Sequence, residues 1–366
     1  MRVVILSKAL VVGAYQRKLE AIATLGVELT ALVPPGWREP RVGWQPLERR
    51  YTTGYHLISL PMALNGQHHL HWYPTLGRML RQLRPEVLHI DEESFNLATF
   101  QAMRLGVALG ARCCFYNYAN IDRFYPPPFN LFERYNLRHA AHALACNQEA
   151  AAIIRRHGYP GPLTIVPQFG VDPELFVPAP PRPATANVTL GYLGRLVPEK
   201  GVLDLVEALV GLPSHVRLRI IGEGTQRPLI EQRRAALGLM ERIEILPAVG
   251  STEVAAALQQ LDALVLPSRT TPSWKEQFGR ILVEAMSCGV PVVGSNSGEI
   301  PHVIGSAGLI FAEGDVAALR AALAELADDP GLRMRLAQAG RARVLAQFTQ
   351  QAIAERHVAV YQSMLG

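Results

Sequence analysis

The second half of the chain takes its predicted fold from Val188-Thr189-Leu190-Gly191-Tyr192-Leu193-Gly194-Arg195-Leu196-Val197-Pro198-Glu199-Lys200-Gly201. Val188 to Leu193 predict a buried strand, and Gly194 predicts a tight turn. The residues from Gly201 onward have the apolar spacing of an amphipathic helix. A strand that passes through a glycine turn into a helix is the repeating unit of parallel α/β sheets.

The same alternation of short apolar runs and amphipathic stretches extends on both sides of this segment. Strands are predicted at 2–7, 28–33, 86–90, 112–116, 142–146, 163–166, 187–192, 216–221, 242–246, 262–266, 291–293 and 308–310. Helices are predicted at 15–25, 95–109, 129–140, 148–158, 201–210, 225–237, 251–259, 279–287, 314–327, 330–346 and 349–364. The segment 34–61, rich in Pro, Gly and Trp, is expected to be irregular.

The 366 residues are enough for two α/β domains. Four prolines within 177–186 predict a linker between them. We therefore expect an α/β protein with a Rossmann-like domain over 1–176, a second over 187–347 and a terminal helical segment over 348–366. Ligands of open parallel sheets bind beyond the carboxyl ends of the strands, so we expect the two domains to face each other across a ligand-binding cleft.

Composition narrows the choice of partners. Residues 1–180 contain 18 Lys and Arg against 13 Asp and Glu, whereas residues 181–366 contain 18 of each. The basic N-terminal half is compatible with a peripheral contact to anionic lipid, with a phosphorylated acceptor, or with an ordinary Arg-rich surface; nucleic acid is not the partner we expect. The four cysteines lie in apolar runs, and the first residues already resemble a strand, so a cytoplasmic location is expected, at most with attachment to the inner membrane surface.

Two cations follow the strand that ends at Leu193. A glycine turn at Gly194 and a helix N-terminus would bring backbone N–H groups close to Arg195 and Lys200, an arrangement suited to a diphosphate. Lys200 is one of only four lysines in a chain that otherwise uses arginine. We therefore expect both cations to bind phosphate.

Two acids stand around the start of a later helix. Glu276 precedes the predicted helix start at Phe278-Gly279, and Glu284 is expected about two turns into that helix. Glu276 could accept hydrogen bonds from sugar hydroxyls beside the amides of Phe278 and Gly279. Glu284 could bind a vicinal diol such as a ribose.

Several motifs in order give the second half a family resemblance. With the segments above, Ile220-Ile221-Gly222-Glu223-Gly224, Ala285-Met286-Ser287-Cys288-Gly289 and Gly298-Glu299-Ile300-Pro301 resemble the donor domain of family 4 glycosyltransferases, which have the GT-B fold. The resemblance covers most of residues 187–345. It implies a retaining, metal-independent transferase with no cofactor, whose substrate is a nucleoside diphosphate sugar, with UDP or GDP favoured.

The resemblance also implies roles for individual residues. Arg195 and Lys200 would hold the diphosphate, Glu276 would contact the donor sugar and Glu284 the ribose. The donor would further be bound by Gly13, Gly194, Glu223, Val249, Gln277, Phe278 and Gly279. The last helix, over 349–364, would cross back onto the first domain.

The N-terminal half departs from the family pattern. Many members place a histidine after the strand that corresponds to 112–116, but this chain has Asn117 and Asn120 there. Asn117 is the candidate for the catalytic role of that histidine. Asn120 is a candidate for acceptor binding, together with three acids that follow another predicted strand: Asp91, Glu92 and Glu93. Helix capping is the alternative role for these acids.

Other interpretations stay open. An inverting transferase of the same fold could use Asp91 or Asp122 as general base. A GT-B epimerase or phosphorylase, or a sugar-nucleotide-binding protein without activity, would also fit the fold. The run His68-His69-Leu70-His71 lacks a further ligand at zinc-like spacing, so we expect a loop there and no metal site.

Overall fold

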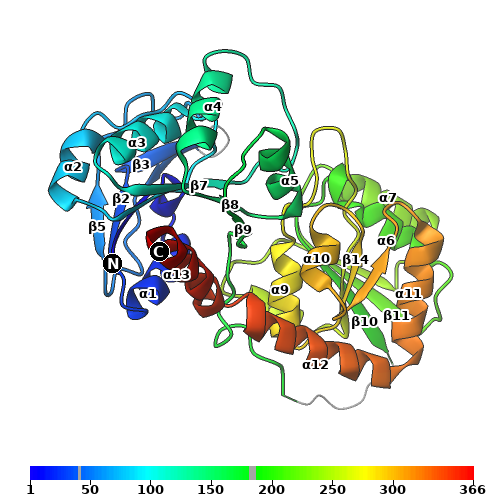
Figure 1. Cartoon of the computed structure of the whole chain (residues 1–366). Helices are drawn as coiled ribbons and strands as arrows, with labels where there is room; N and C mark the ends of the chain where they lie inside the picture. Colours follow the sequence, from blue (N-terminus) through cyan, green and yellow to red (C-terminus); the bar gives the residue numbers. More distant parts are fainter. Residues whose placement is uncertain (40–42, 181–186) are drawn as a thin grey trace. The chain divides into compact units, whose positions relative to one another are not determined.

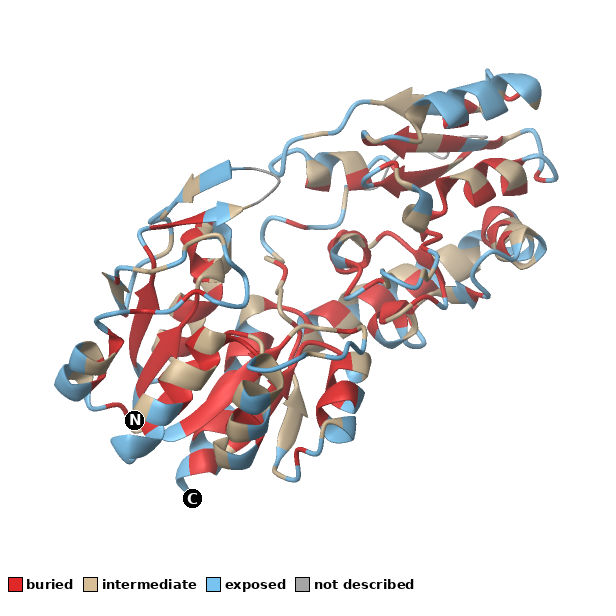
Figure 2. Cartoon of the chain, turned by 90° about the horizontal axis from the view of Figure 1, so that it is seen from above, coloured by how far each residue is buried: buried red, intermediate tan, exposed pale blue. Residues whose placement is uncertain are grey.

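The computed structural model describes residues 1–39, 43–180 and 187–366 (Figure 1). The chain divides into two compact units. The first consists of Met1–Gly170 together with Gln350–Gly366, and the second of Val171–Thr349. In each unit the strands are largely buried, and exposed residues gather on the outer sides of the helices (Figure 2). Each unit therefore has its own core.

Within the described residues, the first unit is built on a seven-stranded parallel sheet with the order β5-β2-β1-β6-β7-β8-β9. Its centre is the Rossmann arrangement, in which strand order reverses beside the first strand. Val4, Ile5 and Leu6 of the first strand are almost fully buried because helices cover both faces of the sheet. The strands are β1 (Arg2–Leu6), β2 (Glu28–Val33), β5 (His56–Ser59), β6 (Val87–Ile90), β7 (Arg112–Asn117), β8 (His142–Ala145) and β9 (Leu163–Ile165).

The helices of the first unit come from both ends of the chain. They are α1 (Arg17–Thr24), α2 (Leu76–Leu83), α3 (Leu97–Ala108), α4 (Phe129–His139), α5 (Gln148–Arg156) and the terminal α13 (Gln350–Leu365). Helix α13 packs on α1 and β6, and its Ile353, Val358 and Tyr361 belong to the core of this unit (Figure 1). Tyr361 also shares a buried 2.7 Å hydrogen bond with Nδ1 of His89 on β6. The last helix is thus part of the first unit.

The segment 34–61 is more regular than the sequence predicted. It holds the antiparallel pair β3 (Gly36–Glu39) and β4 (Gly43–Pro46), and β5 at the edge of the sheet. Pairing with β2 makes β5 a strand although His56-Leu57-Ile58-Ser59 is short and lacks alternation. Helix α2 was also not predicted. Helix α2 packs against α3, and its apolar residues have the spacing of an amphipathic helix.

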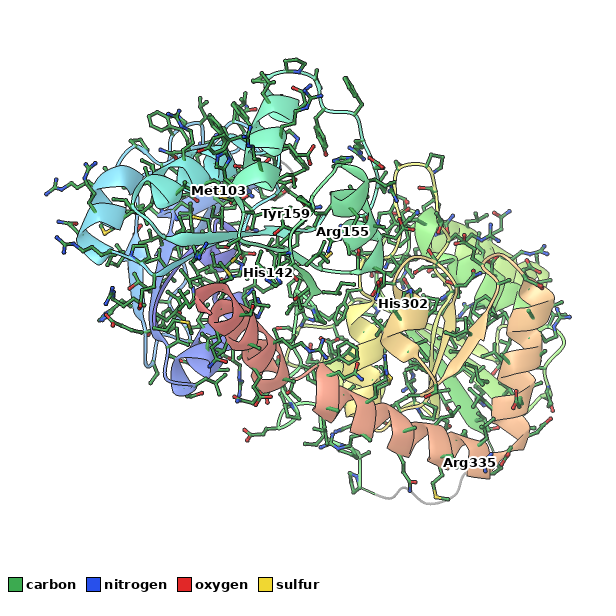
Figure 3. The ribbon with its side chains drawn as sticks, in the orientation of Figure 1. Met103, His142, Arg155, Tyr159, His302 and Arg335 are labelled. Atoms are coloured by element: carbon green, nitrogen blue, oxygen red, sulfur yellow. The ribbon has the colours of Figure 1, made fainter. Side chains whose placement is uncertain are left out.

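On the surface of the first unit, Arg155 contacts the residues that follow α5. The Arg155 guanidinium lies 5.7 Å from the centre of the Tyr159 ring (Figure 3). It also donates hydrogen bonds to the backbone oxygens of Tyr159 and Gly161. This arginine therefore stabilises the end of α5.

Within the described residues, the second unit has a six-stranded parallel sheet with the order β12-β11-β10-β13-β14-β15. This is the Rossmann order, with β10 as the first strand and β13 beside it where the order reverses. The strands are β10 (Val188–Leu193), β11 (Val216–Ile221), β12 (Ile243–Leu246), β13 (Ala263–Leu266), β14 (Val292–Ser295) and β15 (Leu309–Phe311). The predicted strands are confirmed to within one or two residues.

The helices of the second unit cover both faces of its sheet. They are α6 (Val202–Leu209), α7 (Arg227–Ala236), α8 (Val254–Leu258), α9 (Arg280–Ser287), α10 (Ile300–Ile304), α11 (Val316–Asp328) and α12 (Pro330–Gln347). Helix α10, which the sequence did not predict, follows Gly298 and packs against β14. None of the described helices is long and apolar enough to cross a membrane.

The chain enters the second unit between Gly170 and Val171, earlier than the predicted boundary at 176. The Val171 N–H donates a 2.8 Å hydrogen bond to the Phe348 carbonyl. The segment that enters the second unit therefore lies beside the segment that leaves it. Residues 171–176 therefore belong to the second unit. Most of the predicted linker, residues 181–186, lies outside the described residues.

Candidate active site

A pocket of about 390 Å³ lies where β10 and β11 end in the second unit. It is formed by the turn after each strand, by the loop after β12 and by the first turn of α9. Four of the predicted donor-site residues line it: Gly194, Arg195, Glu223 and Val249. The two turns approach closely, since a Cβ on Gly222 would lie 1.9 Å from the Gly194 carbonyl oxygen. Glycine at position 222 therefore lets the two turns pack against each other at the pocket.

The central pair of the candidate site joins two loops. Lys200 ends the short 3-10 helix η3 (Pro198–Lys200), and Glu276 lies between β13 and α9. The Lys200 ammonium is 2.5 Å from Glu276 Oε2, and both side chains are mostly buried, with 15% and 11% exposed. The structure thus brings together the two residues that the sequence assigned to diphosphate and sugar.

Two further groups contact this pair. The Ser268 hydroxyl donates a 3.0 Å hydrogen bond to Glu276 Oε2. The Lys200 ammonium lies 4.8 Å from the centre of the Trp274 ring, within the range of a cation–π interaction. Neither Ser268 nor Trp274 was selected from the sequence. Ser268 stands two residues after the end of β13, which is the one signal that could have pointed to it.

Two glycines hold the loops of the site against each other. Gly201 has φ +63°, and a Cβ there would lie 2.0 Å from the Pro267 carbonyl oxygen. Gly298 has φ +54°, and a Cβ there would lie 2.1 Å from the Glu276 carbonyl oxygen. Both positions need glycine because of the backbone angle and the contact. The backbone around Glu276 is therefore closely packed.

Arg195 is more loosely held than Lys200. Its side chain is 57% exposed, and its guanidinium lies 3.8 Å from a Glu199 carboxylate oxygen. An exposed pair of this kind contributes little to stability. The guanidinium at the pocket wall is thus available to a ligand.

Glu284 lies in the first turns of α9 and pairs with its neighbour. The helix begins at Arg280, because Gly279 stands before it with φ +72°. Glu284 is therefore one turn into the helix and not two, as the sequence had suggested. Burial raises the pKa of Glu284, and Arg280, whose Nε is 2.6 Å from the carboxylate, opposes that rise.

The two residues that follow Glu276 differ in burial. Gln277 is exposed, whereas Phe278 is buried and its ring lies 5.8 Å from that of Phe348. The Phe278 side chain therefore serves the core. Its contribution to a ligand would come from the backbone, as was predicted for Phe278 and Gly279.

In the first unit, Gly13, which was predicted to bind the donor, has a partner within the protein. The Gly13 N–H donates a 3.0 Å hydrogen bond to a carboxylate oxygen of Glu48. The Arg50 side chain lies so close that a Cβ on Gly13 would be 2.6 Å from it. A donor phosphate would therefore reach the Gly13 amide only after Glu48 moves away.

The three consecutive acids after β6 are buried to different degrees and have different partners. Asp91 accepts hydrogen bonds from the hydroxyls of Ser7 and Tyr118. Burial opposes its charge, but the Lys18 ammonium and these hydroxyls lower its pKa overall. Glu92 is fully buried, and burial is outweighed by Lys8 and by His71, so that its pKa falls to about 2.

Glu93 behaves in the opposite way. Burial raises its pKa to about 8, although its carboxylate accepts the Tyr118 N–H at 3.1 Å. Its Oε2 is buried without a hydrogen-bond partner among the described residues. At neutral pH Glu93 is therefore mostly protonated, and its carboxyl is the least satisfied of the three.

The asparagines that replace the family histidine are both buried. Asn117 ends β7, and its Oδ1 lies 3.4 Å from the Ser94 hydroxyl, which it accepts as a weak hydrogen bond. Asn120 is 4% exposed. Asp122, the other candidate base, is bound by His157 at 3.0 Å and by Arg156, and these contacts lower its pKa.

Comparisons with known proteins agree with this geometry. The profile described as "Glycosyltransferase Family 4" matches residues 17–175, and the profile described as "Glycosyl transferases group 1" matches residues 178–343. Together the two profiles cover most of both units. The fold and the matches define a glycosyltransferase of the GT-B class, and the chain belongs to glycosyltransferase family 4.

Individual relatives show how far the likeness extends. A glycogen synthase of Mycobacterium tuberculosis is 37% identical over 198 residues, which are 52% of this chain and 46% of the relative. The lipopolysaccharide core biosynthesis glycosyltransferase LpsD of Rhizobium meliloti is 27% identical over 94% of this chain and 92% of its own length. The chain spans about half the length of the first of these and of several other curated relatives.

Solved structures share the fold at low identity. The structure of Anabaena HepE in complex with UDP has a TM-score of 0.73 at 16% identity, over 99% of this chain and 100% of that one. Sucrose-phosphate synthase from Thermosynechococcus elongatus has a TM-score of 0.69 at 18% identity, over 100% and 99%. These similarities establish the two-unit Rossmann-like architecture.

Proposed function

We propose that this protein transfers a glycosyl group from a nucleoside diphosphate sugar to an acceptor hydroxyl, with retention of the anomeric configuration. The observation that carries the proposal is the Lys200–Glu276 pair, in the same unit as the 390 Å³ pocket that Arg195 lines. The pocket has mixed apolar and polar walls, as expected for a nucleoside. A cation for phosphate and an acid for sugar hydroxyls stand together at the strand ends, where Rossmann sheets bind ligands.

In the proposed reaction the bond between the anomeric carbon and the diphosphate oxygen breaks, and the acceptor oxygen bonds to that carbon on the same face. The diphosphate leaves with the electron pair, and one of its oxygens takes the proton of the acceptor hydroxyl. Lys200 and Arg195 stabilise the negative charge that develops on the leaving group, which is where fixed charges lower a barrier most effectively. Glu276 holds the sugar through its hydroxyls, and Glu284 binds the ribose.

For the donor we propose a UDP- or GDP-sugar. The HepE structure contains UDP, and one relative, 31% identical over 53% of this chain, is named a GDP-mannose-dependent mannosyltransferase. For the acceptor we propose a lipid-linked or phosphorylated glycan, because the basic excess lies in the first unit and LpsD is named for lipopolysaccharide core synthesis. Electrostatic contact with an anionic membrane surface would bring enzyme and acceptor together.

The retaining route is preferred over the inverting one because of the state of the candidate bases. Asp91 is enclosed by Ser7 and Tyr118, and Asp122 by His157 and Arg156. Both have a lowered pKa, which makes a carboxylate a weaker base. Neither is therefore a good acceptor for the proton of a hydroxyl.

The proposal is tested in two stages. Thermal shifts are measured with UDP-, GDP-, ADP- and TDP-sugars, because a ligand that binds the native state raises the melting temperature. The donor with the largest shift is then offered with candidate acceptors, and the anomeric configuration of the product is read by NMR. Inversion would replace the retaining mechanism with its rival. Tight donor binding with neither transfer nor hydrolysis would indicate a binding protein.

A further inference from the structure

Trp274 stands in a tight turn at the edge of the candidate site. The backbone N–H of Thr271 donates to the Trp274 carbonyl at 2.8 Å, and the Trp274 N–H donates back at 3.3 Å. The two residues thus form an isolated antiparallel bridge around Pro272 and Ser273. This short closed turn fixes the backbone from which the indole projects.

The Trp274 indole lies against the Lys200 ammonium, and the backbone of Lys200 does not fix the position of that ammonium. Lys200 ends a single 3-10 turn, and its ammonium is carried on a flexible four-carbon chain. The position of the ammonium is therefore set by its partners, Glu276 at 2.5 Å and the Trp274 ring at 4.8 Å. Because the Lys200 side chain is only 15% exposed, water competes weakly with these partners.

The two partners differ in what a substrate would do to them. Under the proposed function, on which this inference rests, Glu276 turns its oxygens to the hydroxyls of the donor sugar. The Trp274 ring has no polar group for which the sugar would compete at its face. The ring then remains a fixed partner of the Lys200 ammonium while the diphosphate binds.

We propose that Trp274 is a positioning residue, whose indole face holds the Lys200 ammonium beside Glu276 so that the cation stands in place for the diphosphate of the donor. The residue acts through Lys200 and does not itself take part in the reaction. Its contribution is electrostatic, because the attraction comes from the quadrupole of the ring and not from the shape of the side chain alone.

The direct test observes the lysines, of which the chain has only four. Protein labelled with ¹³C and ¹⁵N in lysine gives a signal for each side chain, and the Lys200 signal is assigned by its loss in Lys200→Arg. We expect the ε-methylene signal of Lys200 to be shifted upfield by the ring current and to return to the ordinary position in Trp274→Leu. Lys8, which lies 5.6 Å from the Trp37 ring, is the internal reference and stays shifted in that variant.

The functional test separates charge from shape. Trp274→Leu should lower kcat/KM for the donor by roughly tenfold, and Trp274→Phe by less. Tryptophan with one to four fluorines, introduced at position 274 alone, keeps the shape but weakens the quadrupole, so activity should fall with each fluorine. Trp44→Leu removes an exposed tryptophan of the first unit and should leave activity unchanged.

Each outcome decides the matter. A flat fluorine series with a loss in Trp274→Leu would mean that the ring acts by packing only, and the proposal fails. An unshifted Lys200 signal in the wild type would also overturn it, whether or not the enzyme is active. If no donor is turned over, the proposed function fails, while the lysine spectrum with and without nucleoside diphosphate still shows whether the ring holds Lys200.

Discussion

Lys8 follows β1 in the first unit and Lys200 follows β10 in the second, and each ammonium meets a carboxylate and an indole ring. Lys8 pairs with Glu92 and lies 5.6 Å from the Trp37 ring, whereas Lys200 pairs with Glu276 and lies 4.8 Å from the Trp274 ring. In both units the lysine follows the first strand of a Rossmann sheet. The acid follows the neighbouring strand across the reversal of strand order.

The difference lies in what else each carboxylate binds. Glu92 has no exposed side-chain surface, accepts a further hydrogen bond from Asn96 and lies 3.4 Å from Nε2 of His71. Glu276 keeps 11% of its side chain exposed and accepts a hydrogen bond from the Ser268 hydroxyl. The comparison teaches that the two pairs differ in their carboxylates: Glu92 is fully buried among Lys8, Asn96 and His71, whereas Glu276 keeps part of its surface exposed and can meet a ligand. The role of Glu92 in acceptor binding stays a prediction.

The largest expected effect is that of Lys200→Ala on turnover. Loss of a fixed cation from the leaving group should lower kcat by on the order of 10²–10³-fold, while binding of the free nucleoside changes little. Steady-state kinetics and isothermal titration with uridine and guanosine measure the two quantities. Equal losses in turnover and in nucleoside binding would remove Lys200 from its role at the diphosphate.

Glu92→Gln should act on stability instead. The substitution leaves the Lys8 ammonium without its buried counter-charge, which should lower the free energy of unfolding of the first unit by about 3 kcal/mol. Urea unfolding in a Trp274→Phe background reports this unit, because the three remaining tryptophans lie in it.

The matched variant Glu276→Gln should destabilise the protein less than Glu92→Gln does, because Glu276 keeps part of its surface in water, and yet it should impair transfer. If Glu92→Gln were stable and inactive, the contrast between the two pairs would be wrong and Glu92 would return as an acceptor residue.

Gly298→Ala tests the close packing behind Glu276. The added Cβ would lie 2.1 Å from the Glu276 carbonyl oxygen at φ +54°, so we expect a loss of about 2 kcal/mol of stability and a fall in activity. Gly238→Ala is the control, because Gly238 has φ +69° with nothing within 4 Å of the added Cβ. It should cost about 1 kcal/mol and leave activity intact. Equal effects of the two would show that contact with Glu276 is unimportant.

The last expected effect concerns pH. The folded-state pKa of Glu93 is raised to about 8 from 4.5, so the folded chain retains a proton that the unfolded chain has lost between these values. Stability of the first unit should therefore fall as pH rises through this window, by at most about 1.4 kcal/mol per pH unit. Glu92 has the opposite sign, since its pKa is lowered to about 2 and its stabilisation is lost as pH falls below about 4.5.

Glu93→Gln isolates the first of these effects. The variant should be more stable than the wild type above pH 8 and similar to it near pH 4.5, as measured by thermal unfolding across that range. A difference that does not vary with pH would mean that Glu93 is charged in the folded state at all of these pH values.

The central strands of both sheets could be predicted from the local sequence, but the edge strand β5 could not. Strands such as Val188–Leu193 are largely apolar because both faces of the sheet are covered. Such a run can be recognised in the sequence without knowing which strand pairs with it. His56–Ser59 becomes a strand only by pairing with β2, and no local pattern marks it. Helix α2 differs from β5, because Leu76, Met79, Leu80 and Leu83 have the apolar spacing of an amphipathic helix, so it could have been predicted.

The candidate site divides in a similar way. Lys200 and Glu276 could be predicted because each follows a predicted strand, and strand ends of a parallel sheet lie at one edge. Trp274 could not, because its contact depends on the closed turn with Thr271. Asp91, Glu92 and Glu93 are adjacent acids that look alike in sequence. Their different states arise from burial and from partners far away in the chain, such as Lys8 and Tyr118.

The return of α13 to the first unit has a consequence for biosynthesis. Ile353 and Tyr361 fill the core of this unit, yet they are translated only after the whole of residues 171–349. While the second unit emerges from the ribosome, the surface of α1 and β6 that α13 will cover stays open, and His89 lacks its partner. A nascent chain can thus complete the second unit first, and the first unit closes last.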